Sequence, residues 1–293
     1  MTFDVMLPFY GRFDHLQLAV ESVLSQTHED LRLVVVDDVY PDLAPGEWVR
    51  SLGDPRVEYV RNEVNLGVSR NYLSCVDRMR SDYSMLMGCD DVMLPRFLER
   101  VHELVAEHPG VDVVQPGVRV IDGDGGATDP LADRVKRLVS PRGPRPVLLS
   151  GEPLARSLAF GNWTYFPSIV WKVETIRSIG FRAELDIVQD IGMLLDIARL
   201  DGSLVLDDEV VFAYRRHAAS VSSATAVSGK RFDQERAIFE EQASLLAERG
   251  WPRAARAARR RSLSRLNALT QLPAALRAGD AAGRSALLRH ALR

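Results

Sequence analysis

The chain has little of what marks secreted, membrane-spanning or nucleic-acid-binding proteins. Its 293 residues include two cysteines, Cys75 and Cys89, too few for a disulfide framework and consistent with a reducing compartment. No apolar run approaches the roughly 20 residues of a membrane span, and the start of the chain lacks the basic and long apolar segments of a signal peptide. The formal net charge of -3 gives no global basic excess for binding nucleic acid. We therefore expect a soluble protein of the cytoplasm.

Two motifs of nucleotide enzymes are also missing. No GxGxxG fingerprint follows the first apolar run, which argues against a Rossmann dehydrogenase. The segment at residues 8–12, Pro-Phe-Tyr-Gly-Arg, lacks the glycine-rich basic loop with which sugar-nucleotide nucleotidyltransferases hold a triphosphate. With 46% hydrophobic residues, the chain is long enough for one large domain, or for one domain with an appendage.

Two apolar runs each end in a pair of aspartates. Residues 33–36 lead into Asp37 and Asp38, and residues 85–89 lead into Asp90 and Asp91. Continuous apolar runs of this length are typical of strands buried on both faces of a sheet. Ligands of open α/β sheets bind beyond the carboxyl ends of the strands, and unpaired carboxylates are costly to bury. The two pairs therefore predict one site, built for a metal or a polar ligand.

The first hundred residues alternate between strand-like and helix-like patterns, which is typical of βαβ units and a parallel sheet. Between Asp14 and Gln26, for example, the apolar residues recur at helical spacing. We expect strands at 3–7, 31–36, 57–60 and 85–87, and helices at 14–26, 45–52, 68–79 and 95–107.

After Val111 the pattern is less regular. Residues 122–146 are rich in glycine, proline, aspartate and arginine, and we expect them to form an exposed, mobile loop. From Phe232 onward the chain is rich in alanine, leucine and arginine without strand signals, which predicts two or three helices. Between these regions we expect an apolar stretch at 169–171, a helix at 190–200, and short strands near Leu204 and over 210–214.

Seven short motifs follow one another over residues 3–222. They are residues 7–10 (LPFY), 22–27 (SVLSQT), 34–38 (VVVDD), 61–67 (RNEVNLG), 88–95 (GCDDVMLP), 189–190 (QD) and 214–217 (YRRH) with Ser220 and Ser222. In this order they resemble family 2 glycosyltransferases. The resemblance implies the α/β GT-A fold, a Rossmann-like and mostly parallel sheet flanked by helices. It would comprise a domain at 1–222, with a nucleotide-binding half (1–110) and an acceptor and catalytic half (111–222), and a C-terminal helical region at 223–293.

The resemblance also implies a divalent cation, Mg²⁺ or Mn²⁺, that offsets charge on the diphosphate of a sugar nucleotide. Such hard cations bind carboxylate oxygens, sometimes with one imidazole. Asp90 matches the last aspartate of the family's DxD motif and His217 a C-terminal family histidine, so both are assigned to the metal, with Asp91 beside them in the nucleotide site. Gly88 replaces the first DxD aspartate, which removes one carboxylate but allows close backbone approach. Cys89 is expected to be inert packing rather than a soft metal ligand.

The same resemblance assigns residues to the nucleoside. Asp38 would accept the imide N–H of uracil or thymine, and Tyr10 would stack on the base, with Pro8 and Phe9 shaping the wall. For Asp38 the alternative is a turn residue after the strand, and for Tyr10 it is ordinary packing. Arg70 resembles a family arginine near the nucleotide, with a surface ion pair as its alternative.

Asp190 matches the family's general base, which takes the proton of the acceptor hydroxyl. Gln189 stands where the family more often has glutamate. A residue stabilised at a helix N-terminus is the alternative, and the two roles are compatible. The resemblance then implies an inverting single displacement, in contrast to the double displacement of retaining glycosidases.

The segment 161–168 lies where the family's acceptor side begins. Trp163 and Tyr165 are therefore candidates for stacking on an acceptor sugar, with core packing as the alternative for both. The 122–146 loop would be either a lid that orders over bound donor or a simple insertion.

Arginines recur from Arg249 to Arg293 against few acids. A basic helical stretch of this kind can lie on anionic lipid, which would place the protein at the inner face of the membrane, or bind a partner. From sequence alone we favour the alternative, a solvated helical face with alanine and leucine packing inward.

The leading hypothesis is an inverting glycosyltransferase that moves a sugar from a UDP- or TDP-sugar to a carbohydrate, lipid-linked or small-molecule acceptor. The alternatives are a sugar-nucleotide nucleotidyltransferase and a non-catalytic binding protein of the same fold, which the loss at Gly88 leaves open. The joint presence of Asp90, Asp190 and His217 argues against the binding protein.

Overall fold

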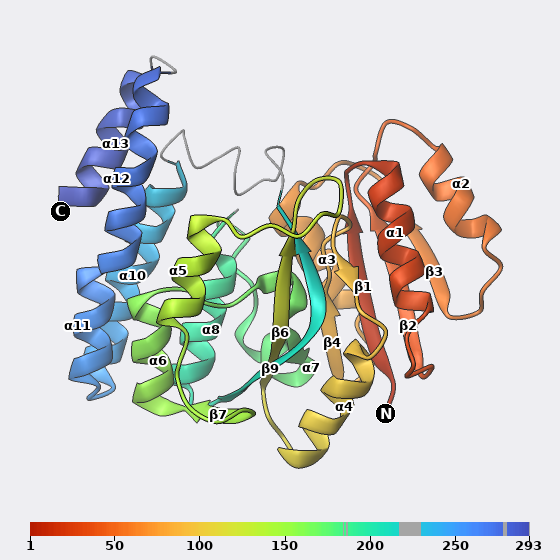
Figure 1. Cartoon of the computed structure of the whole chain (residues 1–293), viewed down its shortest axis with the longest axis horizontal. Coiled ribbons are helices and arrows are strands. Elements are labelled where there is room, and N and C mark those ends of the chain that lie inside the picture. The colour runs from red at the N-terminus through yellow and green to blue at the C-terminus, as the bar shows by residue number, and fades with distance from the viewer. Residues whose placement is uncertain (184, 186, 217–229, 278–279, 293) are drawn as a thin grey trace.

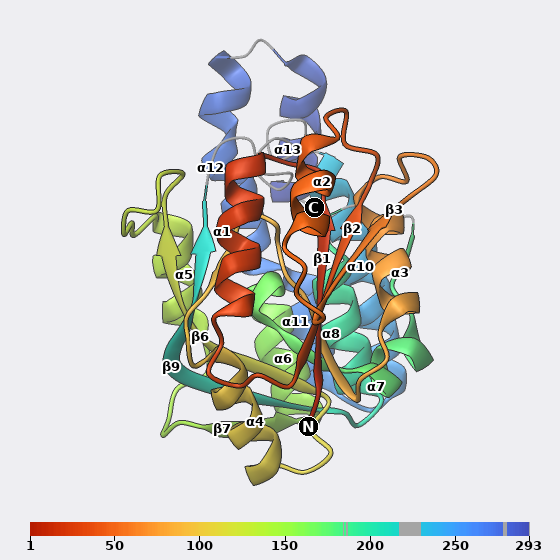
Figure 2. The same ribbon diagram turned by 90° about the vertical axis from the view of Figure 1, so that its right-hand side faces the viewer.

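The structure is a computed structural model that describes residues 1–183, 185, 187–216, 230–277 and 280–292 (Figure 1). Within these residues the strands form one mixed sheet in the order β3-β2-β1-β4-β8-β6-β9-β5, with β7 paired to β9. Helices cover both faces of the sheet, as Figures 1 and 2 show. The α/β class with helices flanking a central sheet is thus confirmed.

The sheet changes character halfway across. Its first half is parallel, as predicted: β1 pairs with β2 and β4, and β2 pairs with β3. In the second half β8 runs antiparallel to β4 and β6, β6 runs parallel to β9, and β5 and β7 run antiparallel to β9. The strands are β1 (Phe3–Phe9), β2 (Leu31–Asp37), β3 (Val57–Arg61), β4 (Tyr83–Leu86), β5 (Val92–Met93), β6 (Val113–Ile121), β7 (Val147–Ser150), β8 (Val170–Lys172) and β9 (Ser203–Arg215).

The helices of the first half follow the predicted positions to within two residues at either end. They are α1 (Phe13–Leu24), α2 (Ala44–Ser51), α3 (Val68–Arg78) and α4 (Phe97–Glu107). The second half adds α5 (Leu131–Val139), α6 (Gly151–Phe160), a 3₁₀ turn at Phe166–Ser168, α7 (Val173–Ile179), α8 (Gln189–Arg199), α10 (Lys230–Glu248), α11 (Pro252–Arg260), α12 (Ser262–Arg277) and α13 (Ala281–Leu292).

Residues 33–36 of β2 are continuously hydrophobic because both faces of this strand are buried. Successive side chains of a strand point to opposite faces. Leu33 and Val35 accordingly enter the core beneath α1 and α4, whereas Val34 and Val36 enter the core beneath α3, α6 and α8. Both faces are therefore dry, and the polar residues are displaced to the end of the strand.

Three predictions about the second half are corrected. Residues 131–139 of the expected loop form helix α5, and its Asp133 is fully buried. The two short strands expected near Leu204 and over 210–214 are one strand, β9, whose polar residues 207–209 interrupt the apolar pattern. Four helices rather than two or three occupy the described part of the C-terminal region.

The C-terminal region falls into two parts. Ile238, Phe239 and Leu246 of α10 enter the same core as the sheet, so α10 and α11 belong to the body of the molecule. Helices α12 and α13, here called the C-terminal helix pair, rise above that body (Figure 2) and share a small separate core around Phe232 and Leu287. Among the helices that the structure describes, none has the length and apolar character needed to cross a bilayer. The predicted boundary at residue 222 lies outside the described residues.

Candidate functional site

The two acidic pairs lie at the same edge of the sheet. Asp37 is the last residue of β2 and pairs with Phe9 at the end of β1. On the other side of β1, the N–H of Met87 donates to the carbonyl of Met6, which carries the chain into Asp90. These ends meet at the top of the sheet in Figure 1. The prediction of a common polar edge is confirmed.

Asp37 is held entirely by protein groups. Its side chain is buried, and Oδ1 accepts the N–H of Tyr40 at 2.7 Å. Oδ2 accepts the hydroxyl of Tyr59 and the guanidinium of Arg61, whose other nitrogen donates to the carbonyl of Tyr40. Burial and the Asp37 carboxylate raise the pKa of Tyr59, so that its hydroxyl stays a donor. Asp37 therefore fixes the turn after β2.

Asp38 is buried as well and organises the following loop. Oδ1 accepts the side-chain amide of Asn62 at 2.9 Å and the N–H of Leu66 at 2.8 Å, and Oδ2 accepts the N–H of Gly67 at 2.9 Å. A carboxylate offers about four acceptor positions, so one position on Oδ2 remains. Asp38 thus has the turn role that the sequence left as an alternative. Its contact with a nucleobase stays a prediction.

The other residues predicted to bind the nucleotide differ in how far their side chains are exposed to solvent. Phe9 is fully buried and packs on Tyr40 with ring centroids 5.0 Å apart, so its side chain belongs to the core and its part in shaping the site wall stays a prediction. Tyr10 is 55% exposed, and its ring meets Tyr40 edge-on, which leaves a face for stacking. Pro8 is partly buried, while Arg70 is exposed and forms no ion pair with a described residue.

The second acidic pair converges on Gly88. A Cβ atom added to Gly88 would lie 2.5 Å from Oδ2 of Asp91 and 2.8 Å from Oδ1 of Asp90, so both oxygens crowd one point. Asp91 is 1% exposed, and its Oδ1 accepts the N–H of Arg215 at 2.7 Å. Its Oδ2 is buried and accepts no hydrogen bond from the described residues. Burial, and then the neighbouring Asp90, raise the pKa of Asp91 well above its ordinary value.

This arrangement fits a hard cation. A buried carboxylate oxygen without a donor, facing a second carboxylate, is a position that positive charge would stabilise. Among the residues that the structure describes, no group of three histidine, cysteine or acidic side chains forms a metal site. His217, which the resemblance assigns to the metal, lies outside the described residues.

Arg215 positions the acidic pair, and sequence reasoning did not single it out. Its side chain is 3% exposed, and Nε donates to the carbonyl of Asp90 at 2.7 Å. Nη1 donates to the carbonyls of Asp122 and Gly123, both at 3.1 Å. The end of β9, the acidic loop and the 122–126 turn are thus tied together by one side chain. Its place inside the YRRH motif was the available signal.

The surroundings of Cys89 agree with its predicted role as a packing residue. A Cβ added at Gly11 would lie 3.2 Å from the Cys89 sulfur, so the thiol fills the space beside that glycine. Burial, then Asp90, raises the pKa of the thiol to about 12. Metal-binding cysteine is a thiolate, and Cys89 remains a thiol at neutral pH.

Asp190 lies in the first turn of α8. Its Oδ2 accepts the side-chain amide of Asn162 at 2.8 Å. Asn162 is itself fixed, because its Oδ1 accepts the hydroxyl of Thr164 at 2.7 Å and the Thr164 N–H at 3.1 Å. The amide is therefore oriented with its NH₂ group toward the carboxylate. This is the support that a general base needs in order to hold one orientation.

Helix α5, expected to be a loop, brings a cation to Asp190. Burial lowers the pKa of Lys136 to about 8, and Asp190 is the largest influence opposing that shift. The ammonium donates to the carbonyl of Thr164 and lies 4.3 Å from the centre of the Tyr165 ring. Apolar residues at 131, 135, 138 and 139 of the sequence were the helical signal that would have revealed α5.

Two arginines complete the surroundings of Asp190. Arg216 makes two hydrogen bonds with the buried carboxylate of Asp133. Arg231 of α10 forms an ion pair with Glu235 at 2.9 Å. The charge of Glu235, and to a smaller extent that of Asp190, raises the pKa of Arg231. Glu235 also accepts a hydrogen bond from Ser264 of α12, so the C-terminal helix pair is linked to this end of the site.

The predicted acceptor aromatics are not available for stacking. Trp163 is 3% exposed, packs in the larger core, and donates its indole N–H to the hydroxyl of Ser157 at 3.1 Å. The Tyr165 hydroxyl donates to Asp133 at 3.0 Å, and Lys136 lies over its ring. Core packing, the alternative for both residues, describes their place in the structure.

Tyr214 lies between the two parts of the site. Its ring is 5.4 Å from that of Tyr165, on the Asp190 side. Burial, and then the charge of Asp91, raise its pKa to about 12, which places it beside the acidic pair as well. The acidic pair and Asp190 therefore belong to one region.

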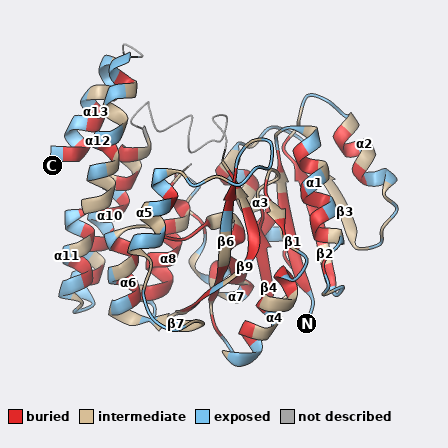
Figure 3. Cartoon of the chain, viewed as in Figure 1, coloured by how far each residue is buried: buried red, intermediate tan, exposed pale blue. Residues whose placement is uncertain are grey.

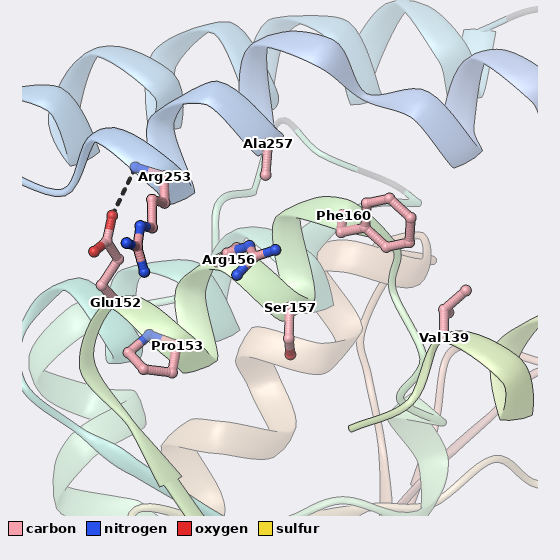
Figure 4. Close-up of a pocket in the computed structure, with 8 residues that line it drawn as sticks. All are labelled: Val139, Glu152, Pro153, Arg156, Ser157, Phe160, Arg253 and Ala257. Carbon is pink, nitrogen blue, oxygen red and sulfur yellow. Dashed lines mark hydrogen bonds between the residues drawn. The ribbon is translucent and has the colours of Figure 1, made fainter. Parts of the chain in front are cut away.

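A groove of about 360 Å³ lies apart from this region, between α6 and α11. Figure 4 shows Arg156 and Phe160 of α6 on one wall and Ala257 on the other, with Glu152 accepting the N–H of Arg253 at 2.7 Å. None of the described site residues lines it. Glu152 caps the start of α11 here, so the groove is a junction between two helices.

Comparison with known proteins gives a consistent result. The sequence model of glycosyl transferase family 2 matches residues 4–171. An uncharacterized glycosyltransferase of Methanocaldococcus jannaschii is 26% identical over 123 residues, 41% of this chain and 42% of that protein. An uncharacterized glycosyltransferase of Rickettsia felis is 24% identical over 220 residues, 73% of this chain and 34% of that protein. The matches thus span less than half the length of these two relatives.

Solved structures share the fold at low sequence identity. Staphylococcus aureus TarS 1-349 in complex with UDP-GlcNAc superposes with a TM-score of 0.67 at 14% identity, over 99% of this chain and 89% of that one. The mannosyltransferase PcManGT of Pyrobaculum calidifontis, in complex with GDP-Man and Mn²⁺, gives a TM-score of 0.60 at 13% identity, over 99% and 79%. The GT-A architecture implied by the sequence is confirmed by these neighbours.

Proposed function

The chain belongs to glycosyl transferase family 2, and from this premise we propose that it transfers a sugar from a nucleoside-diphosphate donor to an acceptor hydroxyl. The observation that carries the proposal is the pairing, in one region, of the Asp90 and Asp91 carboxylates with the amide-oriented Asp190. A diphosphate leaving group and an acceptor hydroxyl need these two chemistries side by side.

The donor end of the site is the edge where β1 and β2 finish. We propose a UDP- or TDP-sugar, with Tyr10 stacking on the base and the remaining acceptor position of Asp38 receiving its imide N–H. Arg70 is exposed nearby on α3 and would meet the negative charge of the nucleotide. The donor complexes of TarS and PcManGT, with UDP-GlcNAc and GDP-Man, support a sugar nucleotide without deciding the base.

Asp90 and Asp91 are the described residues that would hold Mg²⁺ or Mn²⁺, with His217 as a further proposed ligand. When bound, the cation offsets the charge that develops on the diphosphate as the glycosidic bond breaks. Arg215 holds both members of the acidic pair through Asp90 O and Asp91 Oδ1, so they are in place before a ligand arrives. The Mn²⁺ complex of PcManGT supports this assignment.

Asp190 is proposed as the general base of an inverting displacement. Asn162 donates to Oδ2 of Asp190 and so sets the plane of the carboxylate. The charge of Asp190 acts on the basic groups of both Lys136 and Arg231, so positive charge lies on this side of the site. The acceptor, a carbohydrate, a lipid-linked molecule or a small molecule, would enter from this side.

The test is Asp190→Asn, which keeps the shape and the contact with Asn162 but removes the base. We expect kcat for transfer to fall by about 10²–10⁴-fold while nucleotide affinity, measured by calorimetry with UDP and TDP, stays within about twofold. Asp208→Asn, an exposed position on β9, is the matched control and should behave as wild type.

Turnover of Asp190→Asn close to wild type would reject the base assignment. A wild-type protein that binds UDP in the presence of Mn²⁺, but releases none from any UDP-sugar offered with acceptor mixtures, would favour the non-catalytic binding protein. Sugar-dependent release of pyrophosphate from a nucleoside triphosphate would favour the nucleotidyltransferase.

A further inference from the structure

The C-terminal helix pair presents large apolar side chains to solvent, and we propose that this surface docks on an anionic lipid membrane. The surface, here called the leucine face, consists of Leu266, Leu269 and Leu276 of α12 with Leu288 and Leu292 of α13. Each of these side chains is between 44% and 73% exposed. The proposal concerns where the protein works and does not depend on the reaction it performs.

Helix α12 buries small residues and exposes three of its leucines. Its buried positions are Ala268 and Ala275, whereas Leu266, Leu269 and Leu276 are exposed. A helix packed on the core of a soluble protein shows the opposite pattern, with its large apolar residues buried. The sequence prediction that the leucines pack inward is therefore wrong for these three residues, whereas Leu272 packs against the small core as expected. Figure 3 shows exposed residues along the outer side of the pair.

The exposed leucines form a stripe rather than a scatter. On α12 they stand at i, i+3 and i+10, with exposed Pro273 at i+7, and this spacing places them on one face. On α13, Leu288 and Leu292 are one turn apart. A stripe of this kind is an interaction surface, whereas single exposed leucines on a protein surface need no explanation.

Positive charge accompanies the stripe and identifies its partner. Residues 249–293 contain eleven arginines and a single acid, Asp280, while the rest of the chain carries an acidic excess. Arg260 and Arg265 line a shallow depression together with Leu266 and Leu269. Exposed Arg277 and Arg289 directly follow Leu276 and Leu288. Long arginine side chains beside buried apolar groups suit the headgroup region of a bilayer.

Neither a second copy of the chain nor a nucleic acid matches both the exposed leucines and the arginines. A second copy of the chain would bring two arginine-rich faces together, and like charges oppose such a contact. Nucleic acid would pair with the arginines but would leave the leucines in water. An anionic bilayer offers phosphates to the arginines and acyl chains to the leucines, so it matches both.

The experiment is vesicle flotation of the full-length chain. Phosphatidylcholine vesicles are compared with phosphatidylcholine–phosphatidylglycerol vesicles. We expect recovery with the anionic vesicles alone, weakened by added salt. The double variant Leu266→Ser/Leu276→Ser should lower the partition coefficient by about tenfold or more. Arg277→Glu/Arg289→Glu should lower it to a similar degree.

The matched control is Leu18→Ser/Leu43→Ser, which changes two leucines of similar exposure, 47% and 57%, on the body of the molecule. It should float like wild type. Thermal melts of all variants check folding, since exposed substitutions should change stability little. Equal recovery with neutral and anionic vesicles, or equal loss in the control, would overturn the proposal. So would light scattering that shows a dimer abolished by Leu266→Ser/Leu276→Ser in a chain that never floats.

Discussion

The two acidic strand ends look alike in sequence and differ in what surrounds them. Every oxygen of Asp37 and Asp38 accepts at least one hydrogen bond from the protein. In the second pair, Oδ2 of Asp91 is buried with no donor among the described residues, and it crowds the same point as Asp90. All four carboxylate oxygens of the first pair are therefore engaged by the protein, whereas the second pair keeps one buried oxygen without a donor among the described residues. The same dipeptide thus fixes a loop at one strand end and, at the other, forms the cation site that we propose.

Asp38→Ala should have the largest effect of the variants that test this difference between the two acidic pairs. The substitution leaves the N–H groups of Leu66 and Gly67 and the amide of Asn62 without their acceptor. We expect the free energy of unfolding, measured with urea, to fall by about 3 kcal/mol. Asp42→Ala, at an exposed position with one hydrogen bond to Ala44, is the control and should cost within about 1 kcal/mol. Equal losses in the two variants would mean that Asp38 does not hold the loop.

Gly88→Ala tests the crowding of the second pair. The added methyl would stand 2.5 Å from Oδ2 of Asp91, so the carboxylates must move apart. We expect a loss of about 2 kcal/mol in unfolding free energy and a weaker calorimetric response to Mn²⁺. Gly11→Ala meets only the Cys89 sulfur, at 3.2 Å, and should cost less. Unchanged Mn²⁺ binding in Gly88→Ala would place the cation elsewhere.

Asp91→Asn should act in the opposite direction to Asp38→Ala. It removes a charge that burial and Asp90 disfavour, so the free energy of unfolding at neutral pH should rise, by about 1 kcal/mol. Mn²⁺ should raise the melting temperature of wild type and leave that of the variant unchanged. A variant that is less stable than wild type without metal would show that the carboxylate is already satisfied.

The pH dependence gives the smallest and sharpest difference. Because the folded-state pKa of Asp91 is raised, the folded protein holds this proton more tightly than the unfolded chain does. The stabilisation is complete below the unfolded pKa and is lost as pH rises through the folded pKa. Wild type should therefore lose stability relative to Asp91→Asn as the pH rises above about 4, the ordinary pKa of an aspartate, in the absence of metal. Parallel curves for the two proteins would contradict the shift.

The sequence predicted the parts of this molecule that depend on local pattern. The strand over 31–36 and the helix over 68–79 follow from apolar periodicity, and the acidic pairs follow from where the apolar runs stop. Burial within the motif at residues 7–10 was beyond that reasoning. Phe9 and Tyr10 are adjacent aromatics, and only the packing of Tyr40 shows that one is core and the other is exposed.

The surroundings of Asp190 depend on contacts between distant segments. Asp133 pairs with Arg216 across 83 residues of sequence, and Lys136 reaches Asp190 from a helix flanked by glycine and proline. Local composition favoured a loop at residues 131–139 because the charged residues of α5 meet their partners only in the folded chain. The leucine face was missed for a related reason, since α12 carries leucines on more than one side and its sequence does not say which side is covered.

The arginines of the C-terminal helices also make the distribution of charge along the molecule uneven. Figure 1 shows α11, α12 and α13 at one end of the long axis and β3 and α2 at the other. With basic residues gathered at one end and the acidic excess in the remainder, the chain carries a permanent electric dipole. Near a charged surface such a dipole experiences a torque, which acts within about a Debye length, ~8 Å at physiological salt. We therefore expect the molecule to turn its basic end toward a negative surface before any side chain makes contact.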